Sequence, residues 1–252
     1  MKTFLALITG FSVGYLLLPL FLARKSGILQ STNYKGQPIL NSAGVWLSLV
    51  LILGASPMLI WYPKLPLFWF FVLSITFIGF IDDLFYEKAK GIKGHLLKLR
   101  SKILTTGTIK LVFIFLLSLG LVISLQRELW YLDALLLSLF ANTVNTLDTR
   151  PGQAMQFFGF IFLSSLFFTK TDTVRILATV LAGSSLALLP YEMKEKTMLG
   201  DAGANLLGIV VGLMLWDLTL LYKVTLIILA FIWQLVADNF SLSKFIARIK
   251  ER

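Results

Sequence analysis

Four aspartates stand at the ends of long apolar runs, where a carboxylate needs a cation or a basic partner. Asp82 and Asp83 are adjacent in GFIDDLF. Asp148 ends NTVNTLD, and Asp201 follows a glycine in MLGDAGANLLG. Ionised side chains are costly at the edge of membrane hydrocarbon unless they are compensated, and Mg²⁺ prefers oxygen ligands, usually one or two carboxylates with substrate phosphates. The aspartates are therefore candidates for binding Mg²⁺ or for accepting a proton.

Each aspartate motif also has a structural explanation. The pair Asp82 and Asp83 can simply mark the point where a helix meets water, and the motif alone supports both interpretations equally. Asp201 begins a predicted helix, where a free N-terminus favours anionic groups. Asp is also a preferred N-cap residue, and for an isolated G-D-x-G motif the cap is the commoner explanation.

Two asparagines precede Asp148 at intervals of three residues. On a helix with 3.6 residues per turn, Asn142, Asn145 and Asp148 span an arc of about 120° on one face. Amides and a carboxylate aligned in this way suit the recognition of a polar ligand beside a metal ion. A ladder of hydrogen bonds between helices is the alternative.

Basic residues follow the paired aspartates. Six Lys and Arg lie between Asp83 and residue 103, and they suit pyrophosphate or anionic lipid. Simple contact of the loop with lipid headgroups explains most of them equally well. Lys110, inside an apolar run, requires an acidic or phosphate partner unless its ammonium group reaches the membrane surface. His95 is the only histidine, and a single loop histidine is more often solvated than catalytic.

The elements that must position these residues are membrane helices. The 252 residues are 57% hydrophobic with a mean hydropathy of +0.83, well above a soluble domain. Runs of about 20 apolar residues match the hydrocarbon thickness of a bilayer. We therefore predict an all-α bundle of about nine transmembrane helices, forming a single domain over residues 1–252. The predicted helices lie near 3–22, 43–62, 67–82, 104–125, 129–147, 156–169, 174–190, 204–221 and 224–241.

The distribution of basic residues predicts the orientation. The loops on one side contain 16 Lys and Arg and those on the other side contain 6. By the positive-inside rule the richer side is cytoplasmic, so the N-terminus lies outside and the C-terminus inside. All the polar motifs then face the cytoplasm. The net charge of +10 is explained by this orientation and not by nucleic-acid binding.

Three ordered motifs resemble one known family. GFIDDLF, NTVNTLD and MLGDAGANLLG are similar to motifs of the polyprenyl-phosphate N-acetylhexosamine-1-phosphate transferases, in glycosyltransferase family 4. This family includes phospho-MurNAc-pentapeptide translocase and the UDP-GlcNAc:undecaprenyl-phosphate transferases. YKGQP (34–38) resembles its first cytoplasmic loop, and QLVADNFSLSKFIARIK (234–250) resembles a segment near its end. The resemblance therefore covers most of the chain.

The resemblance implies Mg²⁺-dependent transfer of a phospho-sugar from a UDP-sugar to undecaprenyl (polyprenyl) phosphate, with release of UMP. The location would be the cytoplasmic face of a bacterial plasma membrane, in cell-wall biogenesis, with Mn²⁺ as an alternative ion and a homodimer as one allowed assembly. The implied metal ligands are Asp201 and Asp83. Asp82 and Asp83 would orient or deprotonate the lipid phosphate, and the residues implied to contact nucleotide, diphosphate and other phosphates are Asn142, Asn145, Asp148, Lys35, Lys90 and Lys98.

The sequence departs from the family pattern in two places. The family's D-G-x-D-G after the asparagine motif reads DTRPG here, so Pro151 replaces a carboxylate. We also expect a short member that lacks the C-terminal histidine loop. The alternative function is therefore an inactive family member that binds polyprenyl phosphate or scaffolds an envelope enzyme. An aspartate-rich membrane prenyltransferase fits less well, because that chemistry requires two clusters of several aspartates.

Overall fold

The computed structural model describes residues 1–23, 30–32, 38–41, 43–84 and 106–239. These residues contain nine α-helices and one short β-hairpin. The helices are α1 (Lys2–Leu22), α2 (Ala43–Ala55), α3 (Leu65–Leu84), α5 (Thr106–Ser124), α6 (Trp130–Leu147), α7 (Gln153–Ser165), α8 (Asp172–Met193), α9 (Gly200–Leu215) and α10 (Leu220–Asn239), and the strands are β1 (Gln30–Thr32) and β2 (Pro38–Leu40).

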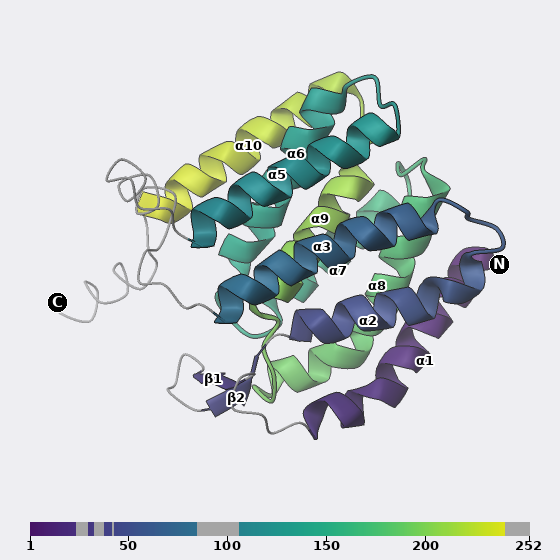
Figure 1. Cartoon of the computed structure of the whole chain (residues 1–252), viewed down its shortest axis with the longest axis vertical. Coiled ribbons are helices and arrows are strands. Elements are labelled where there is room, and N and C mark those ends of the chain that lie inside the picture. Colours follow the sequence, from purple (N-terminus) through teal and green to yellow (C-terminus); the bar gives the residue numbers. More distant parts are fainter. Residues whose placement is uncertain (24–29, 33–37, 42, 85–105, 240–252) are drawn as a thin grey trace.

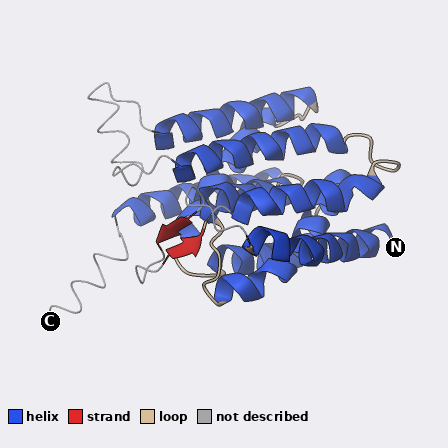
Figure 2. Cartoon of the chain, turned by 60° about the horizontal axis from the view of Figure 1, so that its bottom comes forward, coloured by secondary structure: helices blue, strands red, loops and turns tan. Residues whose placement is uncertain are grey.

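The helices run back and forth in one bundle, so the chain alternates between two ends (Figure 1). One end, called the Asp201 end, holds the last turns of α3, α6 and α8 and the first turn of α9. The other, called the Asp217 end, holds the turn between α9 and α10. The hairpin lies at the Asp201 end (Figure 2). The N-terminus begins at the Asp217 end, and α10 finishes at the Asp201 end.

The observed helices follow the predicted apolar runs, but two of them end clearly earlier than predicted. The predicted run at 204–221 is the helix Gly200–Leu215. The run at 43–62 is helical only to Ala55, because Ser56–Met58 forms a 3-10 turn that contains Pro57, and proline cannot continue the hydrogen-bond ladder. Five described helices are long and apolar enough to cross a membrane: Lys2–Leu22, Leu65–Leu84, Gly107–Ser124, Asp172–Met193 and Leu220–Ala237. The protein is therefore a membrane protein, whereas nine crossings and the predicted orientation remain predictions.

Glycines bring α1 into backbone contact with α8, and α6 into backbone contact with α9. A Cβ added to Gly10 on α1 would lie 2.2 Å from the Val180 carbonyl oxygen on α8, and one on Gly208 of α9 would lie 2.4 Å from the Phe140 carbonyl oxygen on α6. Small residues permit such backbone contact in membranes, where packing replaces the hydrophobic effect as the driving force. Helix α9 is thereby enclosed, and Ile209, Val210 and Leu213 are fully buried.

The hairpin is an addition that the all-α prediction did not include. Its strands are antiparallel, with Gln30 opposite Leu40. The Leu40 carbonyl oxygen accepts hydrogen bonds from the Met198 N–H at 2.8 Å and the Thr197 hydroxyl at 3.0 Å. The Ala43 N–H in turn donates to the Met198 carbonyl oxygen at 3.0 Å. These bonds attach the start of α2 to the segment that enters α9.

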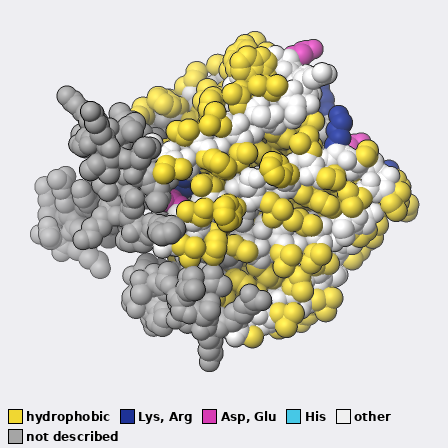
Figure 3. Space-filling model, in the orientation of Figure 1, with side chains coloured by type: hydrophobic (Ala, Val, Ile, Leu, Met, Phe, Trp, Pro, Cys, Tyr) yellow, Lys and Arg dark blue, Asp and Glu magenta, His cyan; other side chains and the backbone are white. Residues whose placement is uncertain are grey.

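Hydrophobic side chains cover most of the face shown in Figure 3, and the charged side chains visible there lie near the two ends of the bundle. Large apolar residues such as Leu16, Phe70 and Phe77 are 71%, 66% and 62% exposed. A soluble protein rarely exposes apolar surface on this scale. The surface is therefore suited to contact lipid between two polar ends.

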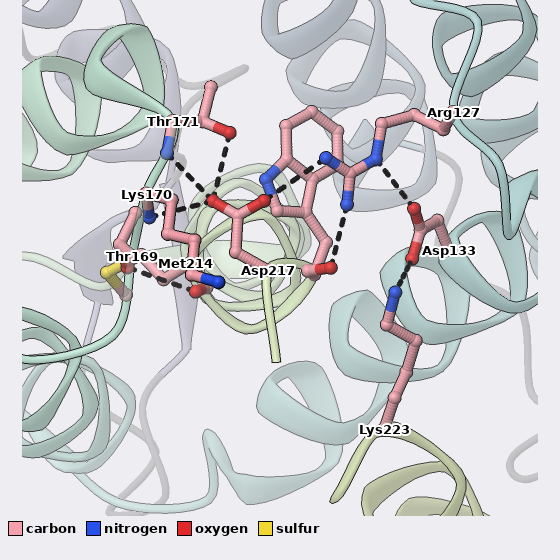
Figure 4. Close-up of polar contacts among 9 residues, drawn as sticks. Arg127, Asp133, Thr169, Lys170, Thr171, Met214, Asp217 and Lys223 are labelled. Carbon is pink, nitrogen blue, oxygen red and sulfur yellow. Dashed lines mark hydrogen bonds and ion pairs between the residues drawn. The ribbon is translucent and has the colours of Figure 1, made fainter. Parts of the chain in front are cut away.

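A network of buried charges closes the Asp217 end (Figure 4). The Arg127 guanidinium donates from Nε to Asp133 at 2.8 Å and from Nη1 to Asp217 at 3.1 Å, and Lys223 pairs with the other oxygen of Asp133. Asp217 also accepts hydrogen bonds from the Thr171 N–H at 2.8 Å and hydroxyl at 2.9 Å. The network ties the turns at this end to one another.

Candidate functional site

Close backbone contact between α2, α3 and α9 builds the Asp201 end. A Cβ on Gly79 of α3 would lie 2.8 Å from the Ala202 Cα, and a Cβ on Gly44 of α2 would lie 2.0 Å from the Gly203 nitrogen. Larger residues would separate these helices. The glycines therefore allow the acidic end of α3 to reach the first turn of α9.

Asp83 caps helix α9 from the neighbouring helix. Its two carboxylate oxygens accept hydrogen bonds from the backbone N–H groups of Asp201 at 2.8 Å and Ala202 at 3.2 Å. These donors have no partner within the helix, and the helix dipole favours an anion at this position. The structural interpretation of Asp201 as its own helix cap is wrong, because α9 has Leu199 at the N-cap position. Asp83 supplies the cap, and the Asp201 side chain is left for other partners.

Gly200 makes this capping contact possible. Its φ is +66°, a left-handed conformation that favours glycine. A Cβ there would lie 2.6 Å from an Asp83 oxygen and 2.6 Å from the Asn41 side-chain oxygen. The glycine before Asp201 is therefore needed both for the turn and for the space that Asp83 occupies.

Lys110 on α5 joins two of the predicted aspartates. Its ammonium group lies 2.6 Å from an Asp82 oxygen and also pairs with Asp201. The Lys110 side chain is 7% exposed, whereas that of Asp201 is 33% exposed. Three helices, α3, α5 and α9, thus contribute one charge each to a cluster that remains open to a ligand on the Asp201 side.

Asp148 and Glu192 extend the acidic cluster. The pKa of Asp148 is raised to about 7, because burial disfavours its charged form and the carboxylates of Asp201 and Asp83 repel it. Glu192 on α8 is 2% exposed and accepts a hydrogen bond from the Leu199 N–H at 3.2 Å. Its second oxygen has no hydrogen-bond partner among the described residues. Asp148 is therefore close enough to the other aspartates for their charges to interact.

The charge balance and donor types at this end fit a divalent cation that also contacts a phosphate. In the described part of the cluster, five carboxyl groups accompany one ammonium group, that of Lys110. Among the described residues, no group of three or more His, Asp or Glu side chains is arranged to hold a metal ion by itself. Mg²⁺ does not need such an arrangement, because it usually binds one or two carboxylates together with waters and substrate phosphates. The residues present therefore fit Mg²⁺ as an ion shared between protein and substrate.

The other predicted site residues fall into two groups. Asn142 and Asn145 are half-buried on the last two turns of α6, the helix that ends at Asp148. No hydrogen bond joins either amide to another residue in the described chain, so the predicted ladder between helices is not observed there. Lys35, Lys90 and Lys98 lie outside the described residues.

Sequence reasoning left three residues of this end out of the predicted site. Lys110 carried a signal, since it is a lysine within an apolar run, and its acidic partners are those that such a lysine requires. Glu192 carried a weaker signal, its position in the polar segment YEMKEK between two apolar runs. Asn41 had no signal, because only the fold brings its side chain beside Gly200 and Asp83.

Comparison with known proteins identifies the family. The family model described as glycosyl transferase family 4 matches residues 65–219. The match runs from α3 to the turn after α9 and so contains Asp82, Asp83, Lys110, Asn142, Asn145, Asp148, Glu192 and Asp201. A search of curated proteins found no match. The family is one of transferases, and both its model and the apolar helices agree with a sugar-phosphate transferase in a membrane. The chain therefore belongs to glycosyl transferase family 4.

Proposed function

We propose that the protein transfers a phospho-N-acetylhexosamine from a UDP-sugar to polyprenyl phosphate, such as undecaprenyl phosphate, and releases UMP. A phosphate oxygen of the lipid would form a bond to the phosphorus that carries the sugar. The bond from that phosphorus to the bridging oxygen of the diphosphate would break, and the electron pair would leave with UMP. The observation that carries the proposal is the cluster of Asp82, Asp83, Asp148 and Asp201 around Lys110 at one end of an apolar bundle.

The depth of this cluster suits a reaction between a lipid and a water-soluble nucleotide. The acceptor's phosphate is polar and its isoprenoid tail is apolar, so the reacting phosphate must stay near the membrane surface. We infer that Asp82 and Asp83, in the last turn of α3, lie at that boundary. We infer that this end faces the cytoplasm of a bacterial cell, where the charge distribution of the sequence would place it.

The proposed roles follow from the contacts of each residue. Asp201 is the more exposed of the two carboxylates that pair with Lys110, so it would hold Mg²⁺ together with Asp83. The ion would neutralise the diphosphate charge that develops during transfer. Asp82 and Lys110 would position the lipid phosphate. Asn142 and Asn145 would bind the nucleotide with polar contacts, and Lys35, Lys90 and Lys98 would contact phosphates.

Two observations favour the alternative of an inactive polyprenyl-phosphate-binding or scaffolding protein. Lys110 already pairs with both Asp82 and Asp201, and Pro151 replaces a carboxylate of the family pattern. A protein that only binds a lipid phosphate would need this lysine and would not need a metal ion. The two candidates therefore differ in whether Asp201 must bind a cation.

A transfer assay separates the two candidates. Purified protein is incubated with Mg²⁺, undecaprenyl phosphate and a panel of UDP-sugars, and UMP release is measured. We expect Asp201→Asn to lower the rate by about 100-fold or more, the usual loss when a group that stabilises transition-state charge is removed. The matched control is Asp172→Asn, which changes an exposed side chain at the Asp217 end and should retain full activity. If no UDP-sugar yields UMP while lipid binding is intact, the enzymatic function would be rejected in favour of the lipid-binding function.

A further inference from the structure

A groove of about 360 Å³ lies between α1 and α8 toward the Asp201 end. Its apolar wall includes Phe11, Tyr15 and Leu186, whose side chains are 44%, 59% and 55% exposed. The rings of Phe11 and Tyr15 stack with their centroids 6.1 Å apart. These residues lie on the outer surface of the bundle, so a molecule could enter this groove from the surrounding lipid.

One small residue, Ala187, also lines the groove. Ala187 is 4% exposed and lies under the wall, and a Cβ added to Gly14 would meet the Ala187 Cβ at 3.4 Å. The glycine side of α1 therefore rests directly on α8, and the larger side chains stand above this contact on either side. Together with Phe11, Tyr15 and Leu186, Ala187 gives the groove an apolar lining, called the apolar channel.

Two lysines stand where the groove reaches the end of α8. Lys194 is the C-cap residue, and Lys196 follows it with its ammonium group 5.7 Å from the centroid of the Tyr191 ring. Both lysines are exposed, and both line the groove. Glu195 lies between them in sequence with a φ of +56°, so the chain turns sharply here. The groove thus joins an apolar channel to a pair of cations at the membrane boundary.

We propose that this groove binds an anionic membrane phospholipid. One acyl chain would lie along Phe11, Tyr15 and Leu186, and the phosphate would lie at Lys194 and Lys196. The apolar channel alone would accept any chain, and the lysines select a negative head group. The groove belongs to α1 and α8, whereas Asp82 and Lys110 lie on α3 and α5. The phospholipid site is therefore separate from the proposed transfer site.

The groove is nevertheless connected to the start of α9. The residues after Lys196 are held by the bonds of Thr197 and Met198 to Leu40 and of the Leu199 N–H to Glu192. Gly200 and Asp201 follow at once. A phospholipid that holds Lys194 and Lys196 would thus steady the segment that places Asp201.

Lipid binding tests the proposal without any need for catalysis. The full chain in detergent is titrated with phosphatidylglycerol or with phosphatidylcholine of the same acyl chains, and bound lipid is counted by native mass spectrometry. We expect the double variant Lys194→Gln, Lys196→Gln to bind phosphatidylglycerol about tenfold to thirtyfold more weakly. The matched control, Lys64→Gln with Lys170→Gln, removes two exposed lysines at the Asp217 end and should bind as the original chain does.

A second variant tests the groove itself. Leu186→Trp keeps both lysines and fills the channel, so it should weaken phosphatidylglycerol binding by a similar factor. Unchanged binding by Leu186→Trp, or equal loss in the matched control, would reduce the effect to general surface charge and overturn the proposal. Equal affinity for phosphatidylcholine would do the same. A shift of Leu186→Trp from dimer to monomer would instead assign the groove to a second copy, and preferential binding of undecaprenyl phosphate would assign it to the acceptor.

Discussion

At the Asp217 end, the cations Arg127 and Lys223 face the carboxylates Asp133 and Asp217, and every one of these charges has an opposite partner. At the Asp201 end, Lys110 is the one cation in an ion pair among the described residues, and several carboxylates surround it. Both clusters lie between helices of the same bundle. The difference indicates that the first cluster is balanced within the described residues, whereas the described part of the second contains more carboxylates than cations.

The pKa values at the two ends shift in opposite directions. Burial by itself would raise the pKa of Asp217, but hydrogen bonds from Thr171, Lys170 and Arg127 lower it below the usual value. Burial and neighbouring carboxylates raise the pKa of Asp148 to about 7. One end thus stabilises ionised carboxylates, and the other disfavours them in the absence of added cations.

The largest loss of stability is expected when a carboxylate is removed from the charge network at the Asp217 end. Asp133→Ala leaves Lys223 and Arg127 without their shared carboxylate, and the free energy of unfolding should fall by about 3–5 kcal/mol, as when one partner of a buried ion pair is removed. Thermal unfolding in detergent measures the change. Asp172→Ala removes a carboxylate from an exposed pair with Arg175 and should change stability by less than about 1 kcal/mol. Equal losses in both variants would contradict the distinction between buried and exposed pairs.

A smaller loss of stability, which Mg²⁺ should partly reverse, is expected for Lys110 and not for Lys223. Lys110→Met leaves Asp82 and Asp201 without their ammonium partner, and we expect a loss of about 1–3 kcal/mol when EDTA is present. Mg²⁺ should restore part of this stability, because it can replace the missing positive charge. Lys223→Met, at the other end, should be destabilised with no recovery in Mg²⁺. The same response to Mg²⁺ in both variants would show that the excess charge at the Asp201 end does not attract a cation.

The smallest effect is a pH dependence at the Asp201 end. The folded-state pKa of Asp148 lies above its unfolded value, so its contribution to stability is fully present below pH of about 4 and is lost as the pH rises through about 7. In EDTA, the melting temperature should therefore decrease between pH 6 and 8. Asp148→Asn should weaken this decrease, whereas Asp172→Asn should not. A slope that is identical in Asp148→Asn would place the titrating group elsewhere.

The pattern of apolar runs was enough to predict most of the helices, because hydrocarbon thickness and backbone hydrogen bonding leave few alternatives to a spanning helix. It also placed Asp82, Asp83, Asp148 and Asp201 at helix ends. The end of the second helix was missed because the apolar run continues through Pro57, where backbone chemistry and not hydropathy stops the helix. The hairpin was missed because its strands are only three residues long and are held by hydrogen bonds from Thr197 and Met198 to Leu40.

The sequence by itself determined the membrane location, the family resemblance and the candidate aspartates, since these depend on composition and local spacing. The tertiary structure decided what each aspartate contacts. Asp83 caps α9 and Asp82 shares Lys110 with Asp201, although these partners are far apart in the chain. Such pairings depend on how closely α2, α3 and α9 approach at Gly44, Gly79 and Gly203. Distances between helices follow from packing of the whole bundle, and no local pattern in the sequence specifies them.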